Sequence, residues 1–177
     1  MAKKYDVAAY VWPSYTGKEP RTKIFWPEEG GEWQTVRNAR LAAPKENGYH
    51  WDYKPLWGCP DEAEPAVMEF QINEASRHGV NVFAYDWYWF DCRPFLEQCL
   101  NEGFLKAKNN DKMKFYVMWA NHDANYSWDV RTSWDQDTAI WRGDVNRPEF
   151  ERVCKRLIGK YFHLPNYYTV DGKPLFS

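Results

Sequence analysis

The sequence has no long apolar run and no excess of charge of one sign. None of its apolar runs approaches the roughly 20 residues of a membrane-spanning helix. The net charge is -2 and the pI is about 6.1, so nothing predicts binding to nucleic acid or to an anionic membrane. The first residues lead into a strand-like run without the apolar segment of a signal peptide, which leaves the cytoplasm as the default expectation.

Paired cysteines and several catalytic motifs are also missing. The four cysteines form neither a C-x-x-C pair nor a zinc-type spacing, so free thiols are expected: Cys59, Cys92, Cys99 and Cys154. No G-x-S-x-G or P-loop glycine pattern and no G-x-G-x-x-G follows any predicted strand. These absences argue against a serine or cysteine nucleophile, a phosphate loop and a dinucleotide site.

Aromatic residues are what the chain has in excess. It is 19% aromatic, with 11 Trp and 12 Tyr, although its mean hydropathy is -0.78. A chain this polar does not need so many rings for its core. Trp and Tyr combine a flat apolar face with a hydrogen-bonding edge, which matches the apolar face and hydroxyl edge of a sugar. The composition therefore favours carbohydrate binding, with a protein interface as the alternative.

The stretch of residues 79–90 is the most informative. Residues 80–85 are mostly apolar and predict a buried strand, and Asp86 and four consecutive rings, Trp87 to Phe90, follow it. Four rings in a row cannot all point inward from one strand, because side chains alternate between its faces. We therefore predict a binding site at the C-terminal end of a parallel strand. The alternative is that the rings are core and that Asp86 caps backbone.

The rest of the chain alternates between predicted strands and helices. Further strands are expected at 6–12 and 114–119, with the approach to a fourth strand at 167–177. Helices are expected at 34–41, 61–78, 93–106, with Asp91 as N-cap, and 146–162. A long aromatic loop occupies about residues 14–60. Such alternation predicts parallel strands with helical crossovers.

The predicted architecture is α/β, a (β/α)8 barrel of the TIM type, with an open doubly wound sheet as the alternative. A full barrel takes typically ~250 residues. The 177 residues supply three complete strand–helix units and the start of strand four. We therefore expect residues 1–177 to be the N-terminal portion of a single barrel domain. An open sheet edge would then allow self-association.

Polar residues that suit chemistry follow the predicted strands or lie in the long loop: Asp86, Asn121, His122, Asp123, His50 and Asp52. Acid–base attack on a glycosidic bond normally needs two carboxylates, and Asp86 and Asp123 are the candidate pair. The alternative is that Asp86 and Asn121 hydrogen-bond loop backbone or fix a Trp N–H. No spacing supports a metal site from the two histidines and their neighbouring aspartates, so no metal is predicted.

Five short motifs occur in order along the chain: Gly31-Glu32-Trp33, Pro55-Leu56-Trp57-Gly58, Asp86-Trp87-Tyr88-Trp89, Glu102-Gly103-Phe104-Leu105 and Met118-Trp119-Ala120-Asn121-His122-Asp123. Together they resemble the glycoside hydrolase family 99-like proteins, a group also described as WbsX-type glycosyltransferase-like. The resemblance runs over essentially the whole chain.

The resemblance implies a (β/α)8 barrel that acts on oligosaccharides or polysaccharides. The hydrolase branch of that family includes endo-acting α-mannosidases that need no cofactor, with acid–base carboxylates expected beyond Ser177. This chain would then supply the sugar-binding half, with His50 from the long loop and these residues: Trp12, Tyr15, Trp33, Asp86, Trp87, Tyr88, Trp89, Trp119, Asn121 and His122. A glycoside hydrolase, a glycosyltransferase of polysaccharide synthesis and a non-catalytic carbohydrate-binding module remain the three candidate functions.

Overall fold

The computed structural model describes residues 5–39, 54–128 and 137–177. His50 and Asp52 lie outside them. The described strands are β1 Ala8–Val11, β2 Val82–Phe90, β3 Arg93–Phe95, β4 Lys114–Trp119, β5 Ala124–Asn125, β6 Ala139–Trp141, β7 Thr169–Val170 and β8 Lys173–Pro174. The α-helices are α1 Trp33–Asn38, α2 Pro65–Arg77 and α3 Arg147–Leu157. Short helical turns include Cys99–Gly103, Phe104–Lys106 and Ile158–Phe162.

The main sheet has β2 at its centre, with β1 on one side and β4 on the other. Both neighbours run parallel to β2, with Ala8 opposite Val82 and Val82 opposite Lys114. The three strands predicted first are therefore adjacent and parallel, and the α/β class is confirmed. Alternating strands and helices produce this arrangement because a parallel pair needs a crossover connection.

β2 is longer than expected because its end pairs with β3. Asp91 and Cys92 have φ of 53° and 58°, the left-handed values of a two-residue hairpin turn, and Phe90 faces Arg93 across it. The prediction of a helix from residue 93 is therefore wrong for its first part, as is Asp91 as its N-cap. The helical turns begin only after Leu96.

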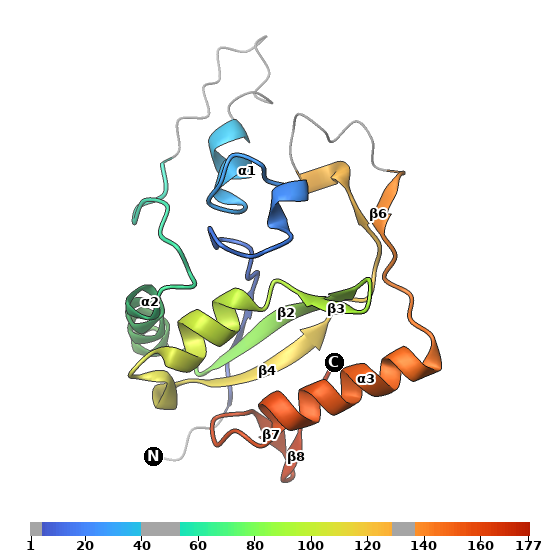
Figure 1. Cartoon of the computed structure of the whole chain (residues 1–177). Coiled ribbons are helices and arrows are strands. Elements are labelled where there is room, and N and C mark those ends of the chain that lie inside the picture. Colours follow the sequence, from blue (N-terminus) through green and yellow to red (C-terminus); the bar gives the residue numbers. More distant parts are fainter. Residues whose placement is uncertain (1–4, 40–53, 129–136) are drawn as a thin grey trace.

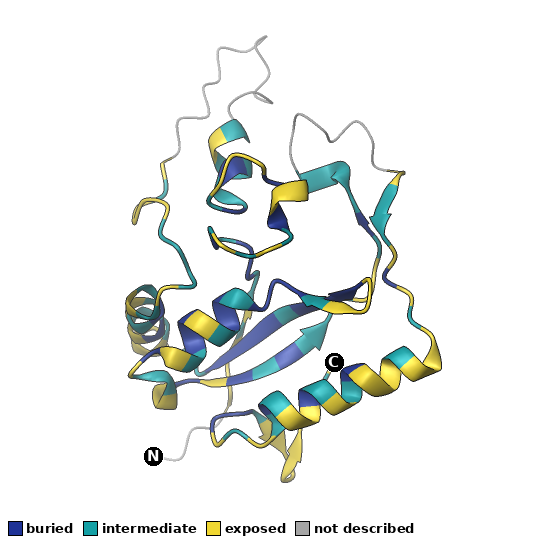
Figure 2. Cartoon of the chain, viewed as in Figure 1, coloured by how far each residue is buried: buried dark blue, intermediate teal, exposed yellow. Residues whose placement is uncertain are grey.

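Helices cover one face of the main sheet, as Figure 1 shows for α2 and α3. Side chains of β2 that face them alternate along the strand and join one core with Met68 and Ile72: Phe83, Tyr85, Trp87 and Trp89. Figure 2 shows β2 buried almost throughout. Ala84, Asp86 and Tyr88 point to the opposite face by the period of two.

A second core, which we call the aromatic cap, lies at the C-terminal ends of the strands. Its buried members are Phe25, Trp26, Tyr88, Phe90, Phe95, Leu96 and Ala124. The ring of Trp128 stacks on Trp26 with centroids 5.5 Å apart and approaches Phe25 at 4.5 Å. The two cores use many of the rings, so the expectation that the core needs few of them is wrong.

The last residues run beside β4 and are interrupted by a hairpin. Tyr167 bridges Phe115 and Phe176 bridges Val117, both in parallel, and Trp119 N–H donates to Ser177 O at 2.7 Å. The β7–β8 hairpin stands between these two contacts. The approach to a fourth strand is therefore present, but it is split.

Asn146 caps the N-terminus of α3, where its side chain accepts from Glu149 N–H at 3.0 Å. Replacing Asn146 with Ala leaves that N–H without its partner, so we expect a loss of about 1 kcal/mol of unfolding free energy. Urea unfolding measures the loss. Asn146→Asp keeps the acceptor and should match the wild type within a few tenths of a kcal/mol; equal losses in both variants would show that the cap has no effect.

Candidate glycan site

Asp86 lies on β2 opposite Met118 of β4, on the face of the sheet away from the helices. Its Oδ1 is buried and has no hydrogen-bond partner among the described residues. Burial raises the pKa of Asp86, and the nearby His122 partly offsets the increase. A half-buried carboxylate with an unsatisfied oxygen is unusual, because buried polar atoms are nearly always paired.

Aromatic rings surround this carboxylate. The ring of Tyr88 meets Trp12 edge to face at 5.6 Å and meets His122 at the same separation. Burial raises the pKa of Tyr88, and the carboxylates of Asp86 and Glu32 raise it further. The structure therefore brings together four of the predicted residues: Trp12, Asp86, Tyr88 and His122.

Glu32 also belongs to this site, and the sequence predicted no role for it. Its Oε2 accepts from Trp12 Nε1–H and from Ser14 Oγ–H, the latter at 2.5 Å. No hydrogen bond joins its Oε1 to the described part of the chain. Glu32 thus fixes the ring of Trp12 and adds a second carboxylate beside Tyr88. The Gly31-Glu32-Trp33 motif indicated that this segment matters, but the sequence does not show which of its side chains faces the strands.

Gly31 explains how Glu32 reaches this position. Gly31 has φ of 58°, and a Cβ on it would lie 2.1 Å from Ser14 O. Only glycine allows the backbones to approach so closely. That approach lets Glu32 N–H donate to Ser14 O at 3.1 Å.

Three tryptophans predicted to bind substrate lie elsewhere. Trp87, Trp89 and Trp119 face the helices, where Trp87 and Trp119 are 6.1 Å apart and Trp119 stacks on Phe150. Side chains that alternate on a strand put these rings on the face opposite Asp86. The expectation that they share a cleft with Asp86 is therefore wrong.

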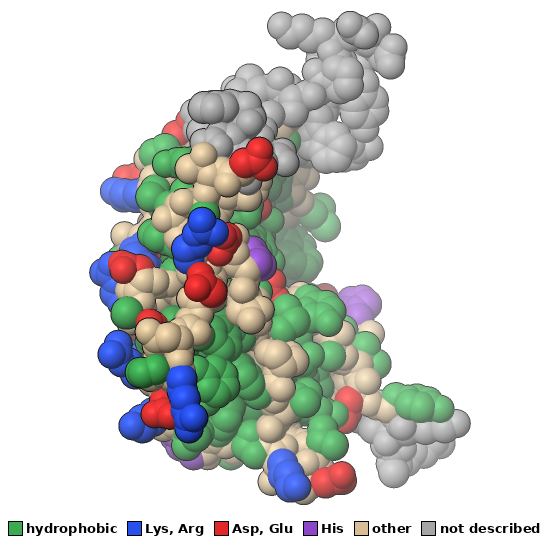
Figure 3. Space-filling model, turned by 90° about the vertical axis from the view of Figure 1, so that its right-hand side faces the viewer, with side chains coloured by type: hydrophobic (Ala, Val, Ile, Leu, Met, Phe, Trp, Pro, Cys, Tyr) green, Lys and Arg blue, Asp and Glu red, His purple; other side chains and the backbone are tan. Residues whose placement is uncertain are grey.

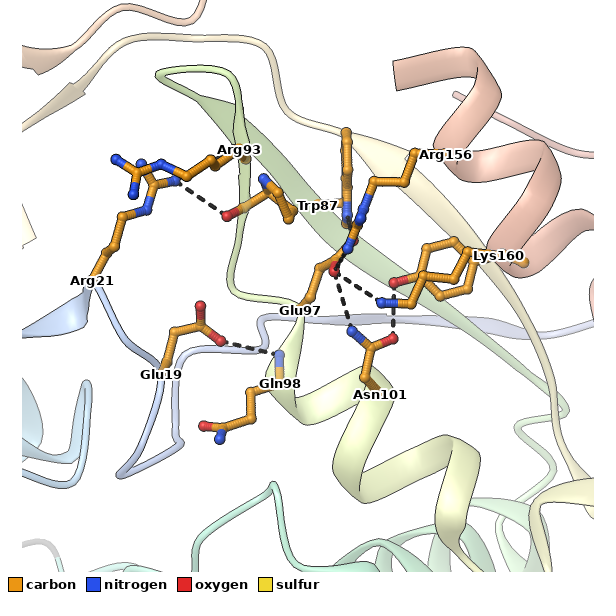
Figure 4. A network of polar contacts seen from close by, with 11 residues as sticks. Glu19, Arg21, Trp87, Arg93, Glu97, Gln98, Asn101, Arg156 and Lys160 are labelled. Atoms are coloured by element: carbon orange, nitrogen blue, oxygen red, sulfur yellow. Dashed lines mark hydrogen bonds and ion pairs between the residues drawn. The ribbon is translucent and has the colours of Figure 1, made fainter. Parts of the chain in front are cut away.

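Trp87 is instead part of a polar network behind the sheet, shown in Figure 4. Glu97, which is only 7% exposed, accepts from Trp87 Nε1–H at 2.8 Å. Arg156 of α3 and Lys160 of the helical turn Ile158–Phe162 also donate to its carboxylate. Hydrogen bonds and these cations lower the pKa of Glu97 to about 2 against the effect of its burial. This network ties β2 to α3 and the turn that follows it.

Asp123, the other predicted catalytic carboxylate, bonds to neighbouring protein groups. Its Oδ1 accepts from Gly143 N–H and its Oδ2 from Arg142, both at 2.8 Å. The Gly143 N–H, together with Arg142, lowers the pKa of Asp123. Because both oxygens are occupied, the structure does not support Asp86 and Asp123 as a catalytic pair. Asn121 is exposed just after β4.

Tyr15 and Trp33 form a separate pair beside the site, with ring centroids 4.5 Å apart. Trp33 Nε1–H donates to Pro60 O at 2.7 Å, so this ring holds the loop in place. Burial and then the carboxylates of Glu32 and Glu62 raise the pKa of Tyr15 to about 12. Tyr15 therefore lies between two acidic side chains.

The family model described as Glycosyltransferase WbsX matches residues 7–177. The chain belongs to the WbsX family. The five motifs that carried the resemblance all lie inside the matched range, and a comparison with curated proteins gives no match.

The WbsX chain is similar in fold to two solved structures of the GH99 endo-alpha-mannosidase from Bacteroides thetaiotaomicron, one of them in complex with BIS-TRIS-propane. Each has a TM-score of 0.51 and 13% identity and covers 96% of this chain. The alignments span 40% and 43% of those structures, so the WbsX chain covers less than half of their length.

Two kinds of feature are not found in the described ranges of the WbsX chain. No group of three or more His, Cys, Asp and Glu side chains there could hold a metal ion. No helix in those ranges is both long and apolar enough to cross a membrane.

Proposed function

We propose that this chain forms the sugar-binding part of a (β/α)8 barrel that hydrolyses glycans and is directed at α-mannosides. One observation carries the proposal: the unpaired, buried oxygen of Asp86 lies at the C-terminal ends of parallel strands, among the rings of Trp12, Tyr88 and His122. Ligands of such folds bind at that end of the sheet. The match to the WbsX family and the similarity of fold to a GH99 endo-alpha-mannosidase support the same proposal.

The geometry suits a sugar for two reasons. Asp86 Oδ1 and Glu32 Oε1 are acceptors without a protein hydrogen bond in the described chain, and a sugar ring presents several hydroxyl donors. The aromatic rings supply the apolar contact for the opposite face of the sugar. We propose that Asp86 and Glu32 bind hydroxyls, and that His122 lies at the open side of the site.

A glycosyltransferase is the second candidate, because the matching family carries that description. Both activities bind a glycan in the site, but in different roles: in hydrolysis the glycan is the glycosyl donor and water is the acceptor, whereas in transfer the glycan is the acceptor and an activated sugar is the donor. Binding of a sugar nucleotide in competition with an α-mannoside would favour the transferase. Binding of the α-mannoside that sugar nucleotides do not affect would favour the hydrolase.

Asp86→Asn tests the proposed site. We expect the affinity for α-mannobiose to fall about 10- to 100-fold, since a hydrogen bond to a charged group contributes about 1.5–3 kcal/mol. Isothermal titration calorimetry measures this change. The melting temperature should stay the same or rise, because burial disfavours the ionised Asp86 in the folded chain.

Asp123→Asn is the matched control, because it makes the same change in a carboxylate whose oxygens are already occupied. Its affinity for α-mannobiose should equal that of the wild type. If both variants lose affinity equally, or if Asp86→Asn binds normally, Asp86 does not bind sugar. Failure of the wild type to bind would reject the proposed function of this chain.

A further inference from the structure

Glu62, in the loop that precedes α2, lies where three segments of the chain meet. Its N–H donates to Tyr15 O at 3.0 Å, in the loop that follows β1. Beside this bond, Asp61 Oδ2 accepts from Gly17 N–H at 3.3 Å. A Cβ on Gly103, which ends a helical turn, would lie 2.1 Å from Glu62 O, so only glycine allows this close approach. The backbone at Glu62 therefore joins the loop after β1 to the helical turn.

The carboxyl group of Glu62 reaches the helix-facing core but finds no positive charge there. Its Oε1 accepts from Gln71 Nε2–H at 2.9 Å, and the buried Cys99 Sγ–H donates to its Oε2 at 3.8 Å. Both donors are neutral, and no cation contacts this carboxyl group within the described residues. Burial raises the pKa of Glu62 to about 7, although the two donors oppose the increase. Ionised Glu62 is therefore less stable in this place than in water.

The titratable side chains that face Glu62 in the described part of the chain are also without positive charge. They come from the loop after β1, from its own loop, from β2 and from the helical turn, respectively: Tyr15, Asp61, Tyr85 and Cys99. Burial raises the pKa of Tyr15 to about 12 and the pKa values of Tyr85 and Cys99 well above their ordinary values. These three groups therefore stay neutral near pH 7, while Glu62 gains its charge there.

The segment that Glu62 holds also carries a contact of the candidate site. Tyr15 directly follows Ser14, whose O accepts from Glu32 N–H at 3.1 Å and whose Oγ–H donates to Glu32 Oε2 at 2.5 Å. Residues 14–17 are thus bonded to Glu32 at one end and to residues 61–62 at the other. A change at Glu62 reaches the candidate site through these bonds and the backbone between them.

We propose that Glu62 is a proton-operated latch, whose neutral carboxyl group holds residues 14–17 against the loop before α2 and whose ionisation favours release of that contact. Release lets water hydrate the carboxylate, which the neutral donors Gln71 and Cys99 do only in part. Switches of this kind need a local change of charge and an element with two positions, and loops held by few hydrogen bonds open most readily. An effect on sugar binding rests on the proposed function, but the latch itself does not.

The latch should weaken as the pH rises. The pKa of Glu62 is about 7 in the closed fold and 4.5 ordinarily, so the closed state is fully stabilised below pH 4.5 and loses that stabilisation as the pH rises to 7. From pH 6 to pH 8 the equilibrium constant for opening should increase about 10-fold. Hydrogen exchange followed by NMR measures this as a protection factor, the intrinsic exchange rate divided by the observed rate. The protection factors of the Glu62 and Gly17 amides should fall about 10-fold.

Two variants and one set of amides serve as comparisons. Glu62→Gln keeps the shape of the side chain and removes its charge, so its protection factors should be equal at pH 6 and pH 8. Glu64→Gln is the matched control, because it makes the same change two positions further on, in an exposed carboxylate that lies 4.0 Å from Lys18. It should keep the 10-fold fall. Amides that bond β2 to β1 and β4 should be better protected than those of Glu62 and Gly17, because they exchange only when the sheet unfolds.

Four results would overturn the proposal. Equal protection of the latch amides and the sheet amides would show that the loops separate only on global unfolding. A constant protection in the wild type, the same fall in the wild type and Glu62→Gln, or a flat profile in Glu64→Gln would each show that Glu62 does not control the opening. The test contains no sugar, so these results leave the proposed function standing. Failure of the wild type to bind α-mannobiose would likewise leave the latch standing.

Discussion

Glu97→Ala should remove a substantial part of the stability of the fold. Breaking a buried ion pair by removing one partner costs about 3–5 kcal/mol, and a typical domain has only about 5–15 kcal/mol in total. Glu97 is 7% exposed and faces Arg156 and Lys160, so the variant leaves two cations without their carboxylate. It also leaves the buried Trp87 Nε1–H unpaired. Urea unfolding at pH 7 measures the loss.

The isosteric variant Glu97→Gln separates charge from shape. The Gln side chain still accepts from Trp87 but does not neutralise Arg156, so we expect a loss of about 3 kcal/mol. Glu102→Gln is the matched control, because Glu102 is exposed and pairs with Lys106 on the surface. Surface pairs contribute about 0–1 kcal/mol. Similar losses at positions 97 and 102 would contradict the buried network.

The same network predicts a pH dependence with a defined sign. The pKa of Glu97 is about 2 in the fold and 4.5 ordinarily, so its stabilising effect is complete above pH 4.5. It is lost as the pH falls from there toward 2, because the unfolded chain then binds the proton first. The difference in stability between wild type and Glu97→Gln should shrink over that window by roughly 3 kcal/mol. A constant difference would show that Glu97 does not carry its charge in the fold.

How much the sequence could reveal is clearest on β2. The apolar run and the change at Asp86 predicted a parallel strand that ends in a site, and the alternation of side chains predicted that the four rings divide between two faces. It did not reveal which face the helices cover, because Tyr85 and Trp87 on one side and Ala84 and Tyr88 on the other are all compatible with burial. The tryptophans were therefore placed on the wrong side.

Local signals also failed where distant residues decide the structure. Asp91 and Pro94 suit a helix start, but pairing of residues 93–95 with β2 overrides that preference. No role was predicted for Glu97, because its partner Arg156 lies 59 positions further along the chain. Glu32 was missed for the same reason: its contact with Trp12 depends on a loop that folds back through Gly31.

The surface retains several large apolar side chains, including Tyr5 at 71%, Val7 at 49% and Tyr10 at 75% exposure. Figure 3 shows hydrophobic side chains at the surface of one face, with Lys and Arg gathered along one margin. Val7 directly precedes β1 and Tyr10 lies on it. In the part of the chain that is described, β1 has β2 as its single neighbouring strand. An unpaired strand edge beside exposed apolar side chains favours pairing with another chain. We therefore expect self-association through β1.

Ala8→Pro should convert the associated chain to a monomer. Val82 N–H donates to Val7 O at 3.2 Å, and in a parallel ladder alternate residues bond to the same neighbour. Val7 and Ala9 therefore bond to β2, while Ala8 directs its N–H to the open side. Proline removes that donor and blocks an added strand without breaking the β1–β2 ladder. Size-exclusion chromatography with light scattering measures the mass, and we expect association to weaken more than 10-fold, as about 1.4 kcal/mol or more of pairing is lost.

Two controls distinguish edge pairing from general loss of structure. Ala8→Val keeps the N–H and should remain associated. Ala9→Pro removes a donor that bonds to β2 and should lower the melting temperature instead of dissociating a folded chain. A wild type that is monomeric at micromolar concentration, or an Ala8→Pro variant of unchanged mass, would exclude β1 as the contact. If the Ala8→Pro variant keeps the mass of an associated wild type, association has to use a surface other than this sheet edge, because the proline removes the hydrogen bond on which any strand added at Ala8 depends.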